Sequence, residues 1–116
     1  MGAVDFTHHA AGESMTHAFH LAQEEARYDF GHSGYTGTIA EKESFRRVTL
    51  PKDVSYDEVL NLITALPSDD SFAKLEKLFG WREASMIVNT YEDKWGPCIG
   101  IEFPPGHFVF AGYASS

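Results

Sequence analysis

The sequence predicts one α+β domain spanning residues 1–116, in which helices cover one face of a mainly antiparallel sheet. Two groups of segments carry apolar residues at helical spacing, other segments alternate as strands do, and short turn-rich connections join most strands. The 116 residues, 43% of them hydrophobic, suffice for a single core. We expect about five strands and three helices, in the order (β)-α-β-β-α-α-β-β-β.

The N-terminal third predicts an arm followed by a long helix. Residues 1–12 have no sustained period and are expected to form a short edge strand or arm. From Ser14 onward, apolar residues recur every third or fourth position, which is typical of an amphipathic helix. They are Met15, Ala18, Phe19, Ala22, Ala26 and Phe30. Ser14 or Gly12 caps the start of this helix, and Gly31 ends it.

A hairpin is predicted next. Glycines at 31, 34 and 37 are followed by alternating β-branched residues, which favour a strand over residues 35–41. Phe45, Val48 and Leu50 predict a second strand that ends at Pro51. A turn near residues 41–43 is expected to pair the two strands.

Two short helices and three strands complete the prediction. One helix runs from about residue 55 to Pro67, which cannot continue it, and the next starts at residue 68 or 69 and ends at Gly80. After Trp81 the apolar period changes to two, which predicts strands over residues 84–91, 98–103 and 108–113. Their connections are dense in turn residues and short enough for antiparallel neighbours.

Composition excludes several classes of function. Seventeen acidic against nine basic residues give a net charge of −8, which repels nucleic-acid phosphates and favours basic partners. No segment resembles a membrane span or a signal peptide, so we expect a cytoplasmic protein without membrane binding. The single cysteine, Cys98, cannot form an intrachain disulfide. We expect it in the core, where free cysteine behaves as a small hydrophobe.

Catalytic patterns are weak. His17, His20 and Glu24 stand at i, i+3 and i+7 on one helix face, a spacing that permits a divalent metal site. The spacing matches no established metal motif, however, and a solvated helix face explains it as well. No nucleophile motif is present, no catalytic residue is predicted and no cofactor is expected.

The glycine-rich run is the main candidate for binding. Gly31 is explained as a helix cap, whereas Gly34 and Gly37 indicate either a structural turn or a close approach to a ligand or partner. The order of helix, loop and strand is the reverse of a phosphate-binding loop. Lys42 offers a positive charge, and Trp95 is either an anchor for a partner or a cap on the sheet edge. The candidate binding residues are Ser33, Gly34, Tyr35, Thr36, Gly37, Thr38, Lys42 and Trp95.

Four stretches form a further pattern: HLAQEEARYDF (20–30), GHSGYTGTIAEK (31–42), DKWGP (93–97) and FVFAGYASS (108–116). From about Ala18 to Ser116 the chain resembles a family of short uncharacterised proteins from phages and actinobacterial genomes. Ser33, where a glycine is usual, and the tail near Tyr113 depart from the family pattern. The resemblance implies a setting, because small acidic phage-borne proteins frequently bind a host enzyme, a defence complex or a signal molecule.

We therefore expect a non-enzymatic accessory protein of phage type that binds and inhibits or sequesters a host component, in the cytoplasm of the host bacterium. The expected partner is a host protein or a small nucleotide-derived signal. Two other classes stay open: a small metal-dependent hydrolase using the histidines from His17 to His32 with Glu24, and a structural or assembly factor. The two-sided apolar strand at 108–113 also predicts a homo-oligomer.

Overall fold

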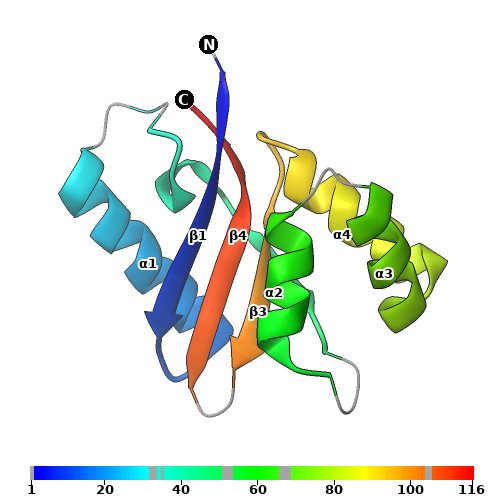
Figure 1. Cartoon of the computed structure of the whole chain (residues 1–116). Coiled ribbons are helices and arrows are strands. Elements are labelled where there is room, and N and C mark those ends of the chain that lie inside the picture. Colours follow the sequence, from blue (N-terminus) through cyan, green and yellow to red (C-terminus); the bar gives the residue numbers. More distant parts are fainter. Residues whose placement is uncertain (1, 32–33, 35, 51–53, 66–68, 104–105) are drawn as a thin grey trace.

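The computed structural model describes residues 2–31, 34, 36–50, 54–65, 69–103 and 106–116. Within them the chain forms one α+β domain with four α-helices and a four-stranded sheet (Figure 1). The elements in order are β1 (Ala3–Ala11), α1 (Met15–Phe30), the 3-10 turn η1 (Ile39–Glu41), β2 (Phe45–Val48), α2 (Tyr56–Thr64), α3 (Asp69–Phe79), α4 (Trp81–Glu92), β3 (Cys98–Phe103) and β4 (His107–Ser115).

The sheet is mixed, with the strand order β1-β4-β3-β2. β4 pairs antiparallel with both β1 and β3, whereas β2 and β3 run parallel. The parallel pair arises because three helices carry the chain from β2 back to the same end of the sheet, as a parallel connection requires. β4 has a strand on each side and its residues are almost all buried. The C-terminal strand therefore lacks the free surface on which we predicted self-association.

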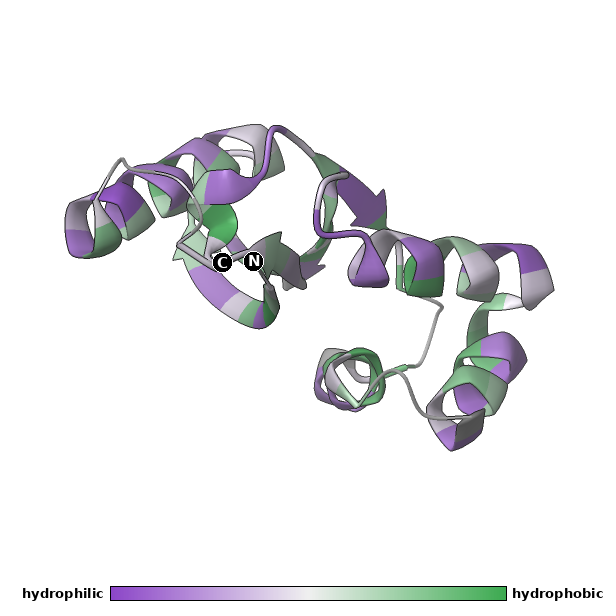
Figure 2. Cartoon of the chain, turned by 90° about the horizontal axis from the view of Figure 1, so that it is seen from above, coloured by the Kyte–Doolittle hydropathy of each residue, from purple (hydrophilic) through white to green (hydrophobic). Residues whose placement is uncertain are grey.

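Helices cover both faces of the sheet, so the prediction of helices on one face is wrong. Figures 1 and 2 show α1 on one side and α2, α3 and α4 on the other. Because successive residues of a strand point to opposite faces, β4 contributes Phe108 and Phe110 to the core under α1 and Ala111 to the core under α4. The domain is a three-layer sandwich with two cores.

The predicted strand over residues 35–41 is absent from the residues described there. Gly34 and Gly37 have φ angles of 81° and 69°, a left-handed backbone that interrupts an extended path. Thr38 then caps η1, its hydroxyl accepting a hydrogen bond from the backbone N–H of Ala40. The chain therefore turns here, and the predicted hairpin with residues 45–50 does not form.

The predicted strand over residues 84–91 is the helix α4. This segment carries both periods: Ala84, Met86 and Val88 alternate, but Ala84, Ile87 and Tyr91 are also spaced as one helix face. The three residues of the helical set are fully buried, and they pack in the core on that side of the sheet. α4 lies against β3 and β4, and α3 packs on α4. Burial of a complete face therefore decided between the two periods.

The other elements confirm the prediction. Ser14 caps α1 by accepting a hydrogen bond from the N–H of His17, and Gly31 ends the helix with a φ of 89°. The predicted apolar stripe is buried except at its last residue, Phe30, which is 61% exposed. Phe19 packs between Phe45 and Phe110, with ring centroids 5.2 and 5.3 Å away. The N-terminal segment is an edge strand, β1, and Cys98 is buried in the core as expected.

The predicted pair of short helices, α2 and α3, also forms close to its predicted bounds. Pro67, which was expected to separate these helices, lies outside the described residues. Of the helices that the structure describes, none is long and apolar enough to span a lipid bilayer.

Candidate functional site

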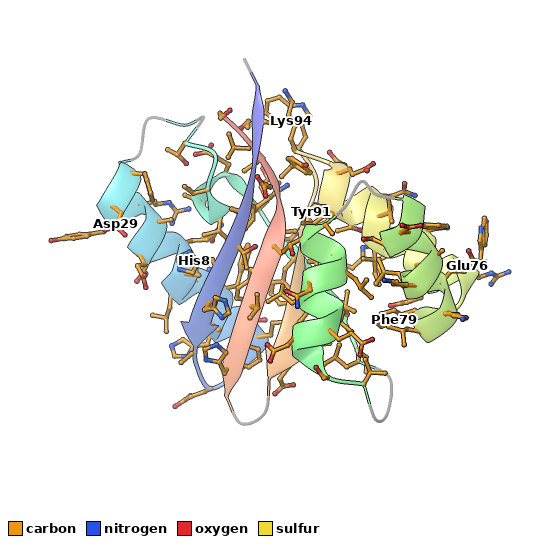
Figure 3. All side chains as sticks on the ribbon, viewed as in Figure 1. His8, Asp29, Glu76, Phe79, Tyr91 and Lys94 are labelled. Carbon is orange, nitrogen blue, oxygen red and sulfur yellow. The ribbon has the colours of Figure 1, made fainter. Side chains whose placement is uncertain are left out.

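Two segments hold the predicted binding residues: the glycine segment, residues 31–42, and the Trp95 turn, residues 93–97. They are far apart in the sequence, and the structure joins them through one side chain, that of Lys42. Figure 3 labels Lys94, which marks the Trp95 turn at the end of the sheet where both chain termini lie. The two segments, which the sequence analysis treated separately, therefore lie side by side in the fold.

Lys42 lies inside the protein, which corrects its predicted role as a surface cation. Its side chain is only 2% exposed. The Nζ atom donates to the carbonyl oxygens of Asp93, at 2.8 Å, and Gly96, at 3.0 Å. Two acceptors make the burial of an ammonium group tolerable, because an unpaired buried charge would be far more costly. Burial lowers the pKa of Lys42, while the nearby Cys98 and Asp93 act in the opposite direction.

The Trp95 turn is also held by its own first residue. A carboxylate oxygen of Asp93, Oδ1, accepts hydrogen bonds from the backbone N–H groups of Trp95, at 2.9 Å, and Gly96, at 3.0 Å. The Trp95 side chain is nevertheless 63% exposed. Nζ of Lys94 lies 5.1 Å from the centroid of the indole ring, within the range of a cation–π contact. The turn thus displays a large aromatic ring on a fixed backbone.

At Gly37 the glycine segment has a structural role, because its backbone packs against both ends of the chain. Its N–H donates to the carbonyl of Ser115 at 2.8 Å, and a Cβ atom here would lie 3.2 Å from that of Val4 and 3.3 Å from that of Ser116. A side chain would require these neighbours to shift by a few tenths of an ångström, and the positive φ would strain it in any case. Gly37 is therefore required where the segment crosses the ends of β1 and β4.

The amide of Gln23 ties the same segment to α1. Its Nε2 atom donates to the carbonyl oxygens of Ile39, at 3.3 Å, and Lys42. Since Gln23 is itself buried, these bonds hold η1 against the helix from within. The position of Lys42, and with it the Trp95 turn, is consequently set by α1.

Thr36, Thr38 and Glu41 form a half-buried polar cluster beside Gly37. The Thr36 hydroxyl lies 2.7 Å from Oε2 of Glu41 and 2.8 Å from the Thr38 hydroxyl. Their polar atoms bond to one another, so they offer a ligand few unused groups. Gly34 is half-buried, and a Cβ atom at this position would lie 3.9 Å from its nearest neighbour. The two remaining candidates, Ser33 and Tyr35, lie outside the described residues.

The candidate metal ligands of α1 do not form a site. His17, His20 and Glu24 are all exposed, and Nδ1 of His17 accepts a hydrogen bond from the backbone N–H of Glu13. Across the described parts of the chain, no three His, Cys, Asp or Glu side chains are placed to hold one metal ion. His32 is not among the described residues.

An open cavity of about 400 Å³ lies elsewhere, on α3. The described residues that line it are Ala73, Lys74, Glu76 and Lys77. Sequence reasoning did not identify this surface, because exposed lysines at helical spacing are typical of any solvated helix. The cavity is therefore separate from the candidate site.

Comparison of the chain with protein-family models, with curated proteins and with solved structures gave no match. The class of protein defined by the fold and the site is a small acidic α+β domain that displays a tryptophan on a braced turn.

Proposed function

We propose that this protein is a non-enzymatic binding protein, of phage accessory type, that inhibits or sequesters a host protein through the Trp95 turn. The observation that carries the proposal is the exposure of Trp95 on a backbone held by four hydrogen bonds, two from Lys42 and two to Asp93. Tryptophan is among the residues that most often dominate the binding energy of protein interfaces.

The bracing of the turn supports this role. A flexible loop loses conformational entropy when it binds, at about 0.5–1.5 kcal/mol for each side chain that becomes ordered. The backbone around Trp95 is already fixed from inside by Lys42 and from outside by Asp93. The backbone of the turn is therefore ordered before a partner arrives, and only the exposed side chains remain to be fixed.

Charge narrows the class of partner. The net charge of −8 attracts basic surfaces and speeds their encounter, whereas it repels nucleic acids. A partner with an apolar pocket for the indole ring, surrounded by basic residues, fits both features. A small nucleotide-derived signal fits less well, since the polar groups of Thr36, Thr38 and Glu41 are already bonded to one another.

The two alternative classes make different predictions. A metal-dependent hydrolase would need His17, His20 and Glu24 to act together, and turnover would disappear in His17→Ala and His20→Ala. A structural or assembly factor would need no ligand, so substitution of Trp95 would leave its activity unchanged. Neither alternative explains why the backbone that carries an exposed indole is held by four hydrogen bonds.

The test compares two tryptophans of equal exposure. Trp81 is 65% exposed at the start of α4, and Trp95 is 63% exposed just beyond its end; a 12-residue helix separates them by about 18 Å. The partner is first isolated from host lysate and identified, and its affinity is then measured with purified proteins. We expect Trp95→Ala to weaken binding by about 30-fold or more, the size of an interface hot spot, and Trp81→Ala by less than about threefold. Equal affinity of the two variants would refute the proposal.

A further inference from the structure

α2, α3 and α4 cover one face of the sheet but leave this face open at β1. Two histidines meet there. Every second residue of β1, from Ala3 through Asp5, Thr7 and His9 to Ala11, is exposed on this side. In Figure 1 no helix passes in front of β1. Ala11 pairs with His107 and His9 pairs with Val109, so His9 and His107 are diagonal neighbours on one face.

Their ring nitrogens lie close together. Nδ1 of His9 is 3.3 Å from Nε2 of His107, and the ring centroids are 5.5 Å apart. Zinc binds imidazole nitrogen at about 2.0–2.1 Å in tetrahedral geometry, which places two such ligands about 3.3–3.4 Å from each other. The separation of the two nitrogens is therefore that of a pair bound to one tetrahedral ion.

From this geometry we propose that His9 and His107 form a binding site for a divalent transition metal, with zinc as its representative. Imidazole is a ligand for zinc, copper and nickel, whereas magnesium and calcium prefer oxygen. His9 lies on β1 and His107 on β4, and the antiparallel pairing of these strands brings the two rings together before a metal binds. Two of the four tetrahedral positions are then left to water, one more than in open zinc sites with three protein ligands.

The facing nitrogens lie at hydrogen-bond distance, and which of them donates depends on the tautomer of each ring. When an ion binds, both facing nitrogens must present lone pairs to it. A small rotation of the rings then directs both lone pairs at the ion.

The site is independent of the proposed function and differs from the metal site predicted on α1. His17, His20 and Glu24 were selected because helical spacing places them on one face. His9 and His107 are 98 residues apart, and their meeting depends on the register between β1 and β4. A two-histidine site is also smaller than the sets of three side chains discussed above.

Calorimetric titration of the full chain with zinc chloride at neutral pH tests the proposal. We expect one ion per chain, and binding weakened about tenfold or more, equivalent to about 1.4 kcal/mol, in both His9→Gln and His107→Gln. His20→Gln, which changes an exposed histidine of α1, is the matched control and should stay within about twofold of the unmodified protein. Magnesium chloride should give no binding.

Imidazole resonances in NMR spectra provide a second readout that does not depend on the variants. Sub-stoichiometric zinc should shift the signals of His9 and His107 before those of His17 and His20. Absence of zinc binding, unchanged affinity in His9→Gln, or shifts confined to the α1 histidines would each overturn the proposal.

Discussion

Replacement of Lys42 by methionine tests the central structural claim about the Trp95 turn. Methionine keeps most of the length and apolar volume of the lysine side chain but removes the ammonium group. The variant therefore loses the hydrogen bonds to the carbonyl oxygens of Asp93 and Gly96 while packing stays similar. If Lys42 were a surface cation, as the sequence predicted, this substitution would leave stability almost unchanged.

The expected loss follows from the two bonds and the burial that opposes them. A hydrogen bond from a charged donor contributes about 1.5–3 kcal/mol. Desolvation of the ammonium group, which lowers the pKa of Lys42, offsets part of this gain, and water can reach the carbonyl of exposed Asp93. We expect a net destabilisation of about 2–3 kcal/mol. For 116 residues, at about 2.1 cal/mol/K per residue, this lowers Tm by about 8–12 °C.

Thermal and urea unfolding followed by circular dichroism measure this loss. The control is Lys94→Met, which removes a neighbouring cation whose contact with the Trp95 ring is worth only about 0.5–1 kcal/mol. In a Trp81→Phe background, Lys42→Met should also make Trp95 more accessible to added quenchers of its fluorescence. A Tm within about 2 °C of the parent, or equal losses in Lys42→Met and Lys94→Met, would refute the bracing role of Lys42.

Two further predictions concern alkaline stability and self-association. Burial raises the pKa of the Cys98 thiol from 9.0 to about 12, so between these values the folded protein keeps a proton that the unfolded chain loses, and stability falls as the pH rises. At pH 10.5 this decrease in stability amounts to about 2 kcal/mol. Urea unfolding should therefore show that Cys98→Ala loses about 2 kcal/mol less stability than the parent between pH 8 and pH 10.5. Equal losses in the two proteins would contradict the prediction. We also expect a homodimer formed through the outer edge of β1, with which no other strand of the described residues pairs, because long edge strands associate readily. Light scattering should then give twice 12.9 kDa and a lower mass for Thr7→Lys, whereas a monomer at high micromolar concentration would disprove it.

Elements whose pattern had one interpretation were predicted well. The stripe of α1 has helical spacing only, and Ser14 and Gly31 mark its ends by their capping chemistry. The alternating apolar runs near the C-terminus likewise became β3 and β4. By contrast, residues 84–91 satisfied both periods, and only the packing of Ala84, Ile87 and Tyr91 in a common core selected the helix. That choice also replaced a hairpin connection by a crossover and made the sheet mixed.

In the candidate site, too, some features follow from the local sequence and others depend on tertiary contacts. The sequence by itself placed Trp95 in a turn, because turn residues act on their near neighbours. In the glycine segment it predicted a strand over residues 35–41, where the positive φ angles of Gly34 and Gly37 turn the chain instead. Tertiary structure decided that Lys42 lies inside, since the carbonyl groups that accept its hydrogen bonds belong to residues 51 and 54 positions further along the chain. It likewise decided that His9 meets His107, through a strand register spanning almost the whole chain. Local preferences act over a few residues, whereas the burial of a charge or the meeting of two rings depends on groups that only the complete fold brings together.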